Sequence, residues 1–145
     1  MRKRSLSREL ALQCLCPLDV QGEDALQDLE EIIAEGTSDA AVKAFARELA
    51  RGCYEHRADI DRELTDVAEH WNLRRMAVVD RNILRLGAFE LIHRPDTPPT
   101  VAINEAIELA KRYSTVESGA FVNGILDKVR LRLAAAKTPK RRDDD

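Results

Sequence analysis

The segment that most constrains the fold is apolar around almost its whole circumference when drawn as a helix. It runs from Met76 to His93 and is followed by Pro95, which cannot continue a helix. A surface helix shows one apolar stripe, whereas a helix that is apolar on most sides is buried among other helices. The segment therefore predicts a helical fold with this helix at its centre.

The rest of the chain shows helical periodicity almost everywhere and no alternating run of β-branched residues. Pro17 is expected to limit the first helix, and Thr37, Ser38 or Asp39 to cap the third. The apolar stripe of the fourth helix, which Asp59 is expected to cap, extends to Trp71. We predict an all-α fold of about seven helices around one core. The first expected helix begins near Ser5. The others cover residues 24–35, 42–53, 59–71, 76–93, 101–113 and 117–136.

Composition narrows the class of protein. The chain has 145 residues, of which 44% are hydrophobic and 34% are charged, values typical of a folded domain and not of a disordered or membrane protein. Met1–Ser5 is basic but precedes no long apolar run, so no signal peptide and a cytoplasmic location are expected. We predict one domain over residues 1–136 and a disordered charged tail over residues 137–145.

Motifs for catalysis or cofactor binding are missing from the sequence. It contains no glycine-rich phosphate loop, nucleophile elbow or zinc-protease motif. Asp80 and Glu90 lie ten residues apart and do not form an acid–base pair. Three cysteines and three scattered histidines favour neither a disulfide framework nor a metal site. A protein that is not an enzyme, with no cofactor, is therefore expected.

Charge is distributed unevenly along the chain. Residues 1–18 carry four basic side chains and one acidic, residues 19–70 five basic and fifteen acidic, and residues 71–145 fourteen basic and ten acidic. Such polarity favours a polyanion on one face of the molecule. A basic end that only aids solubility is the alternative, and composition does not decide between them.

Three stretches of the sequence form recognisable motifs. They are Arg-Glu-Leu-Ala-Leu-Gln-Cys-Leu at 8–15, Asp-Arg-Asn-Ile-Leu-Arg-Leu-Gly-Ala-Phe-Glu-Leu at 80–91, and Val-Ala-Ile-Asn-Glu-Ala-Ile-Glu-Leu-Ala-Lys at 101–111 with Phe-Val-Asn-Gly-Ile-Leu-Asp at 121–127. These stretches resemble the NusB family of bacterial transcription antitermination factors. The resemblance extends over about residues 4–133 in the expected order, and residues 20–70 match by pattern only.

The resemblance implies seven helices in two small bundles and a function without catalysis. Proteins of this family bind the single-stranded boxA element of ribosomal RNA leader transcripts together with a ribosomal protein of the NusE type. The complex joins elongating RNA polymerase, which then reads through terminators. Some members form homodimers, and the sequence leaves the oligomeric state open.

The expected RNA-binding residues come from the basic N-terminus and from the last helix. Arg2, Lys3, Arg4 and Arg8 are cations suited to phosphates. The resemblance places Phe121 beside the RNA, and Ser118 with the free N–H groups of that helix start is suited to a phosphate. Core packing is the alternative for Phe121, since Ile125 follows at helical spacing. The family usually has a tyrosine beside the RNA where this chain has Cys16, so one stacking platform is lost.

The resemblance also suggests a surface for the ribosomal partner at the start of the central helix. Asp80 matches an acidic family position that faces basic residues of the partner, and Arg81 and Arg85 lie nearby. A simple first-turn carboxylate is the alternative for Asp80.

Two other functions remain open. The first is the RNA-binding domain of a ribosomal RNA cytosine methyltransferase, whose N-terminal part resembles NusB. No methyl-donor domain follows, and Cys16-Pro17 reverses the order of the catalytic Pro-Cys pair. The second is a helical adaptor without RNA affinity.

Overall fold

The computed structural model describes residues 2–68 and 70–137. Within these residues it contains seven α-helices, two short 3-10 helices and no strand, which confirms the all-α prediction. The helices are α1 (Lys3–Gln21), α2 (Leu29–Gly36), α3 (Ala40–Glu55), α4 (Arg57–Val67), α5 (Val78–His93), α6 (Pro99–Tyr113) and α7 (Val116–Lys137), with 3-10 helices η1 (Gly22–Asp28) and η2 (Leu73–Arg75).

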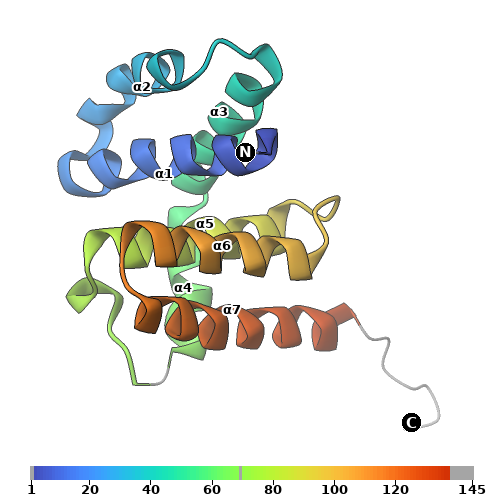
Figure 1. Ribbon diagram of the computed structural model, residues 1–145. Coiled ribbons are helices and arrows are strands. Elements are labelled where there is room, and N and C mark those ends of the chain that lie inside the picture. The colour runs from blue at the N-terminus through green and yellow to red at the C-terminus, as the bar shows by residue number, and fades with distance from the viewer. Residues whose placement is uncertain (1, 69, 138–145) are drawn as a thin grey trace, which may run out of the picture.

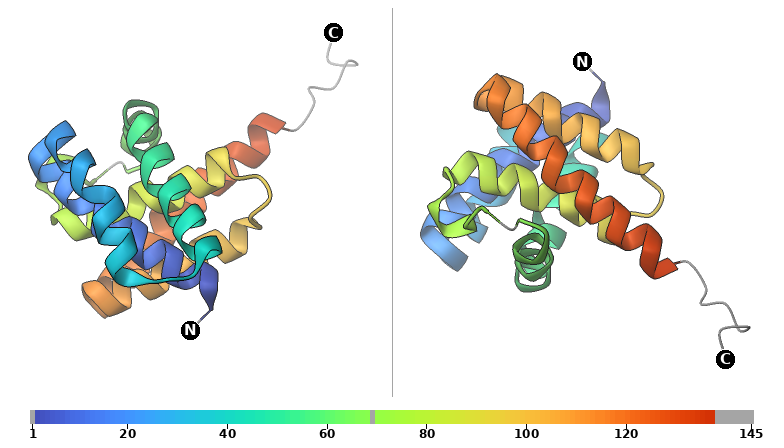
Figure 2. Two further views of the ribbon diagram at one scale, coloured as in Figure 1. Left: turned by 90° about the horizontal axis from the view of Figure 1, so that it is seen from above. Right: turned by 90° about the horizontal axis from the view of Figure 1, so that it is seen from below.

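The helices form two small bundles that share one core. Helices α1, α2 and α3 lie in one layer, and α5, α6 and α7 lie beneath them (Figure 1). Viewed from below, α7 crosses α5 and α6, with which it is in contact (Figure 2). Helices α3 and α4 adjoin at His56, which caps both of them.

Helix α5 is the central element, as its sequence predicts. It contacts α1 and α3 of the first bundle and α4, α6 and α7 of the second. Eight of its residues are buried, among them the polar Asn82 and Glu90. Asn82 and Glu90 form hydrogen bonds with side chains of α1, as buried polar groups require.

Two expected helix boundaries are wrong. Helix α1 continues through Pro17 to Gln21, because Leu18 beyond the proline is buried and Asp19 is held by hydrogen bonds from α5. Helix α4 ends at Val67, so Trp71 lies outside it and is 57% exposed. Its indole was expected in the core stripe.

Asp39 caps α3, and its carboxylate accepts hydrogen bonds from the backbone N–H groups of Ala41 and Val42. This confirms one of the three expected caps of α3. The predicted tail begins at Lys137, which is the last residue of α7. The remainder of that tail lies outside the described residues.

Candidate nucleic-acid interface

The first turn of α1 carries three exposed cations. Arg2, Lys3 and Arg4 follow one another there, and this turn contains no acidic residue. The Lys3 ammonium lies 2.9 Å from Asp39, and the hydrogen bond and charge of that carboxylate raise the pKa of Lys3. Within the described chain, Arg2 and Arg4 form no ion pair. The helix N-terminus is itself positive, so the three side chains do not stabilise the helix they begin.

Arg8 does not belong to this exposed set, contrary to expectation. It is 2% exposed, and its Nε and Nη2 donate to the two carboxylate oxygens of Glu90 at 2.6 and 2.9 Å. Burial opposes the charged form, but Glu90 and Glu105 outweigh it and the pKa of Arg8 is raised. Arg8 therefore fastens α1 to α5 and has no free face for a phosphate.

The predicted residues Phe121 and Ser118 lie beside Asp80, at the start of α5. Glu90, which binds Arg8, lies near the other end of that helix. A surface cavity of about 490 Å³ brings them together. Its lining residues are His70, Trp71, Asn72, Arg75, Met76, Asp80, Glu117, Ser118 and Phe121.

Two aromatic rings form one wall of this cavity. The Trp71 and Phe121 centroids lie 4.6 Å apart with the rings edge to face, and Phe121 also packs against the core. Phe121 therefore both packs against the core and lines the cavity, and its place beside the RNA stays a prediction. Trp71 was missed as a site residue because its spacing continues the stripe of α4. The end of that helix at Val67 turns it outward.

Polar groups occupy the other side of the cavity. The Ser118 hydroxyl lies 3.4 Å from Asp80 Oδ2 and also contacts the hydroxyls of Ser114 and Thr115. Its backbone N–H donates to Thr115 Oγ1, so this N–H is not free. Asp80 Oδ1 is buried and has no hydrogen-bond partner among the described residues. An unpaired buried carboxylate oxygen is destabilising.

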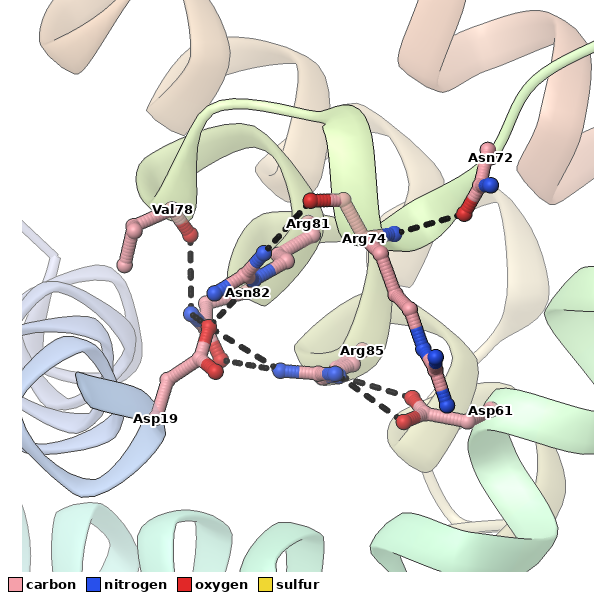
Figure 3. Close-up of polar contacts among 8 residues, drawn as sticks. All are labelled: Asp19, Asp61, Asn72, Arg74, Val78, Arg81, Asn82 and Arg85. Carbon is pink, nitrogen blue, oxygen red and sulfur yellow. Dashed lines mark hydrogen bonds and ion pairs between the residues drawn. The ribbon is translucent and has the colours of Figure 1, made fainter. Parts of the chain in front are cut away.

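Arg81 and Arg85, expected to face the partner, point into the molecule instead (Figure 3). Arg81 Nε donates to Asp19 at 2.5 Å, and Arg85 donates to both oxygens of Asp61 at 2.7 and 2.9 Å. Asn82 also donates to Asp19. Burial alone would raise the pKa of Asp19, but these donors lower it. The two arginines connect α1, α4 and α5, and their charges are already compensated.

A groove between α1 and α6 leads away from the cationic turn. It encloses about 640 Å³ and is lined by residues that include Arg2, Ser5, Asn104, Lys111 and Arg112. At its end the Tyr113 hydroxyl donates to Glu9 at 2.6 Å, and Arg112 lies 3.0 Å from the same oxygen.

Tyr113 supplies an exposed ring beside Glu9 at this end of the groove. It is 38% exposed, whereas Cys16 is half-buried. Burial and the Glu9 carboxylate raise the pKa of Tyr113, so the ring is neutral at neutral pH. The next residue, Ser114, contacts Ser118, so the groove adjoins the Asp80 cavity.

Comparison with known proteins identifies the family. The NusB family model matches residues 5–130. The chain belongs to the NusB family. A relative from Desulfitobacterium hafniense, named transcription antitermination protein NusB, is 51% identical over 130 residues, which cover 87% of this chain and 86% of the relative. The prediction of a protein that is not an enzyme is thereby confirmed.

Solved NusB structures share the fold. T. maritima NusB is 39% identical with a TM-score of 0.77, and the match covers 90% of this chain and 92% of that one. A structure of the antitermination factors NusB and NusE in complex with double-stranded RNA is 28% identical with a TM-score of 0.81, over 91% of this chain and 98% of that one. Among the described residues no helix is long and apolar enough to cross a membrane.

Proposed function

We propose that this chain is a transcription antitermination factor that binds single-stranded boxA-type RNA of ribosomal RNA leader transcripts. In this proposal it binds together with a NusE-type small-subunit ribosomal protein and joins the antitermination complex of RNA polymerase in the cytoplasm. Membership of the NusB family supports the general role. The observation that carries the proposal is the cationic turn at one end of the α1–α6 groove and the Asp80 cavity at the other.

The RNA backbone is assigned to the cationic turn. Arg2 and Arg4 have no ion pair in the described chain, and Lys3 is exposed. Exposed cations that do not stabilise their own helix are suited to neutralising phosphates. The acidic residues of the groove, Glu9 and Glu105, are already bonded to Tyr113 and Ser5, so they oppose the strand less than free carboxylates.

The bases are assigned to the aromatic side chains farther along. Tyr113 offers an exposed ring at the end of the groove, and Trp71 with Phe121 forms a second surface. Stacking on such rings contributes roughly 1–3 kcal/mol per base. Ser118 is the weakest of the expected phosphate contacts, because Asp80 and Glu117 line the same cavity and repel a phosphate.

The ribosomal partner is assigned to Asp80. Its unpaired Oδ1 is an acceptor for a basic side chain, and a charge-assisted hydrogen bond would satisfy it. Arg81 and Arg85 contribute by fixing the start of α5 and not by direct contact. A solved structure of NusB and NusE in complex with double-stranded RNA supports a protein partner and an RNA partner for this fold.

The test is titration of a U/A-rich single strand with the chain, with and without the ribosomal partner, at two salt concentrations. We expect tighter RNA binding when the partner is present, which would show that the two sites are thermodynamically coupled. Asp80→Lys is expected to weaken partner binding and not to weaken RNA binding by the chain alone, because it replaces a carboxylate that repels phosphate with a cation.

Absence of RNA binding at low salt, even with the partner, would favour the adaptor. Turnover of a labelled methyl donor would favour the methyltransferase relative. Unchanged partner affinity in Asp80→Lys would remove Asp80 from the partner surface.

A further inference from the structure

Three arginine side chains surround one phenyl ring at the start of α1. The guanidinium carbons of Arg4, Arg94 and Arg8 lie 4.1, 5.3 and 5.6 Å from the centroid of Phe45. Phe45 belongs to α3 and is 6% exposed, so its ring is held by the core. Such contacts fall within the range of a cation–π interaction.

Two of these arginines are already neutralised. Arg8 is paired with Glu90. Arg94 is paired with Glu48 and, at 3.0 Å, with Asp96. Their charges are compensated, and their part is to enclose the ring.

Arg4 differs from both. It is exposed, it is the nearest to the ring, and no carboxylate of the described residues pairs with it. A cation–π contact uses the face of the guanidinium and leaves its N–H donors free. Arg4 also lines a surface cavity of about 470 Å³ with Arg2, Lys3 and Pro98. Asp96 and Glu105 also line this cavity, and both are occupied by intramolecular partners.

We propose that Phe45 is a positioning residue that holds Arg4 with its donor edge toward this cavity, where Arg4 binds a phosphodiester of the RNA strand. The inference rests on the proposed function and goes beyond it by ranking the cations. Arg4 is preorganised and uncompensated, Lys3 is engaged by Asp39, and Arg2 has no such support. A guanidinium fixed before binding loses less conformational entropy when it meets the phosphate.

The first experiment removes the ring and keeps every charge. Phe45→Leu is expected to weaken binding of a short U/A-rich single-stranded RNA by about threefold, the size of an exposed cation–π contact. The slope of log K against log salt is expected to stay unchanged, since no charge is lost. Phe45→Tyr retains the aromatic face and is expected to restore binding.

Phe89→Leu is the matched control. Phe89 is a buried phenylalanine of α5 whose ring contacts are histidines and not arginines. It should lose stability in a similar way and keep its RNA affinity. Urea unfolding of both variants identifies a temperature at which each is folded. RNA binding is measured at that temperature.

A second experiment begins with variants that leave the core unchanged. Arg4→Lys keeps the charge but loses the planar group, and is expected to bind RNA less tightly than the matched Arg2→Lys. In the double variant Phe45→Leu with Arg4→Ala, affinity is expected to equal that of Arg4→Ala alone.

Three results would each overturn the positioning role of Phe45. They are wild-type affinity in Phe45→Leu, equal effects of Arg4→Lys and Arg2→Lys, and losses that multiply in the double variant. Failure of the wild-type chain to bind the RNA at low salt, even with the ribosomal partner present, would instead overturn the proposed function, so the two failures are distinguishable.

Discussion

Arginines six positions apart in sequence have opposite roles in α1. Arg2 is exposed and unpaired in the described chain, whereas Arg8 is buried against Glu90. Both were expected to bind RNA because they are basic and close together in the sequence. The difference depends on Glu90, which lies 82 residues from Arg8 and on a helix whose register against α1 is set only by packing.

This contrast predicts different stabilities for two variants. Removal of one partner from a buried ion pair leaves an unpaired charge inside, so Arg8→Ala should lower the free energy of unfolding by about 3–5 kcal/mol. Arg2→Ala should change it by less than about 0.5 kcal/mol. Urea unfolding of the two variants and the wild type measures both values. Equal midpoints for the two variants would show that the Arg8–Glu90 pair does not stabilise the fold.

A histidine pair predicts how stability depends on pH. The rings of His56 and His93 stack with centroids 4.0 Å apart, and His93 Nε2 is buried without a partner in the described chain. Burial, with the neighbouring His56, lowers the pKa of His93 from its usual value of 6.5, although Asp59 acts in the opposite sense.

The unfolded chain therefore takes up a proton at a pH where folded His93 does not. Stability from this residue is present above its unfolded pKa of about 6.5 and is lost as pH falls toward the lower folded value. Urea unfolding at pH values on both sides of about 6.5 should show this loss in the wild type and a smaller loss in His93→Asn. The same pH dependence in both proteins would assign the effect to other groups.

At the scale of helices, periodicity predicted which elements form and missed where two of them end. The stripe of α5 was sufficient to place that helix in the centre, since a helix apolar on most sides has no other stable position. Pro17 was a poor guide to the end of α1. A proline removes one hydrogen bond from a helix, and tertiary contacts of Leu18 and Asp19 outweigh that loss.

The candidate site was predictable to a similar extent. Asp80 and Phe121 were found from the resemblance, and the structure places them in one cavity. Trp71 and Tyr113 were not found, because exposure depends on where neighbouring helices end. Arg81 and Arg85 were assigned outward because their acidic partners, Asp19 and Asp61, lie far away in sequence.

Two glycines on neighbouring helices give a test of helix packing. A Cβ at Gly87 of α5 would lie 2.5 Å from Leu126 Cδ1, whereas a Cβ at Gly124 of α7 meets nothing within 4 Å. Close packing of the two helices therefore requires a glycine at 87 and not at 124. Leu126 is buried and has little room to move.

Gly87→Ala should therefore destabilise the fold by about 1–3 kcal/mol through overpacking. Gly124→Ala should stabilise it by about 0.5–1 kcal/mol, since alanine favours a helix over glycine. Thermal or urea unfolding of both variants measures the difference. A stable Gly87→Ala variant would mean that α5 and α7 separate more easily than their packing indicates.

For the whole molecule, charge separation and fold act together. Residues 19–70 hold fifteen of the acidic side chains and form the end of α1, η1, α2, α3 and α4. The cationic turn lies at the other end of α1. A strand of RNA is thus attracted to one end of the groove and repelled from the α2 side of the first bundle.

The number of cations that reach the RNA backbone is open to direct measurement. Four contacts, with Arg8 included, would give a slope of log K against log salt near −3, at about −0.7 per phosphate of a single strand. Because Arg8 is buried and paired with Glu90, the structure leaves Arg2, Lys3 and Arg4, and the expected slope is about −2. Filter binding of a U/A-rich strand over a series of salt concentrations measures this slope.

Two variants test which cations contribute to the slope. Arg2→Ala should make the slope less steep by about 0.7. Arg8→Met, assayed where it is folded, should leave the slope at the wild-type value. A less steep slope in Arg8→Met would show that Arg8 leaves Glu90 when RNA binds.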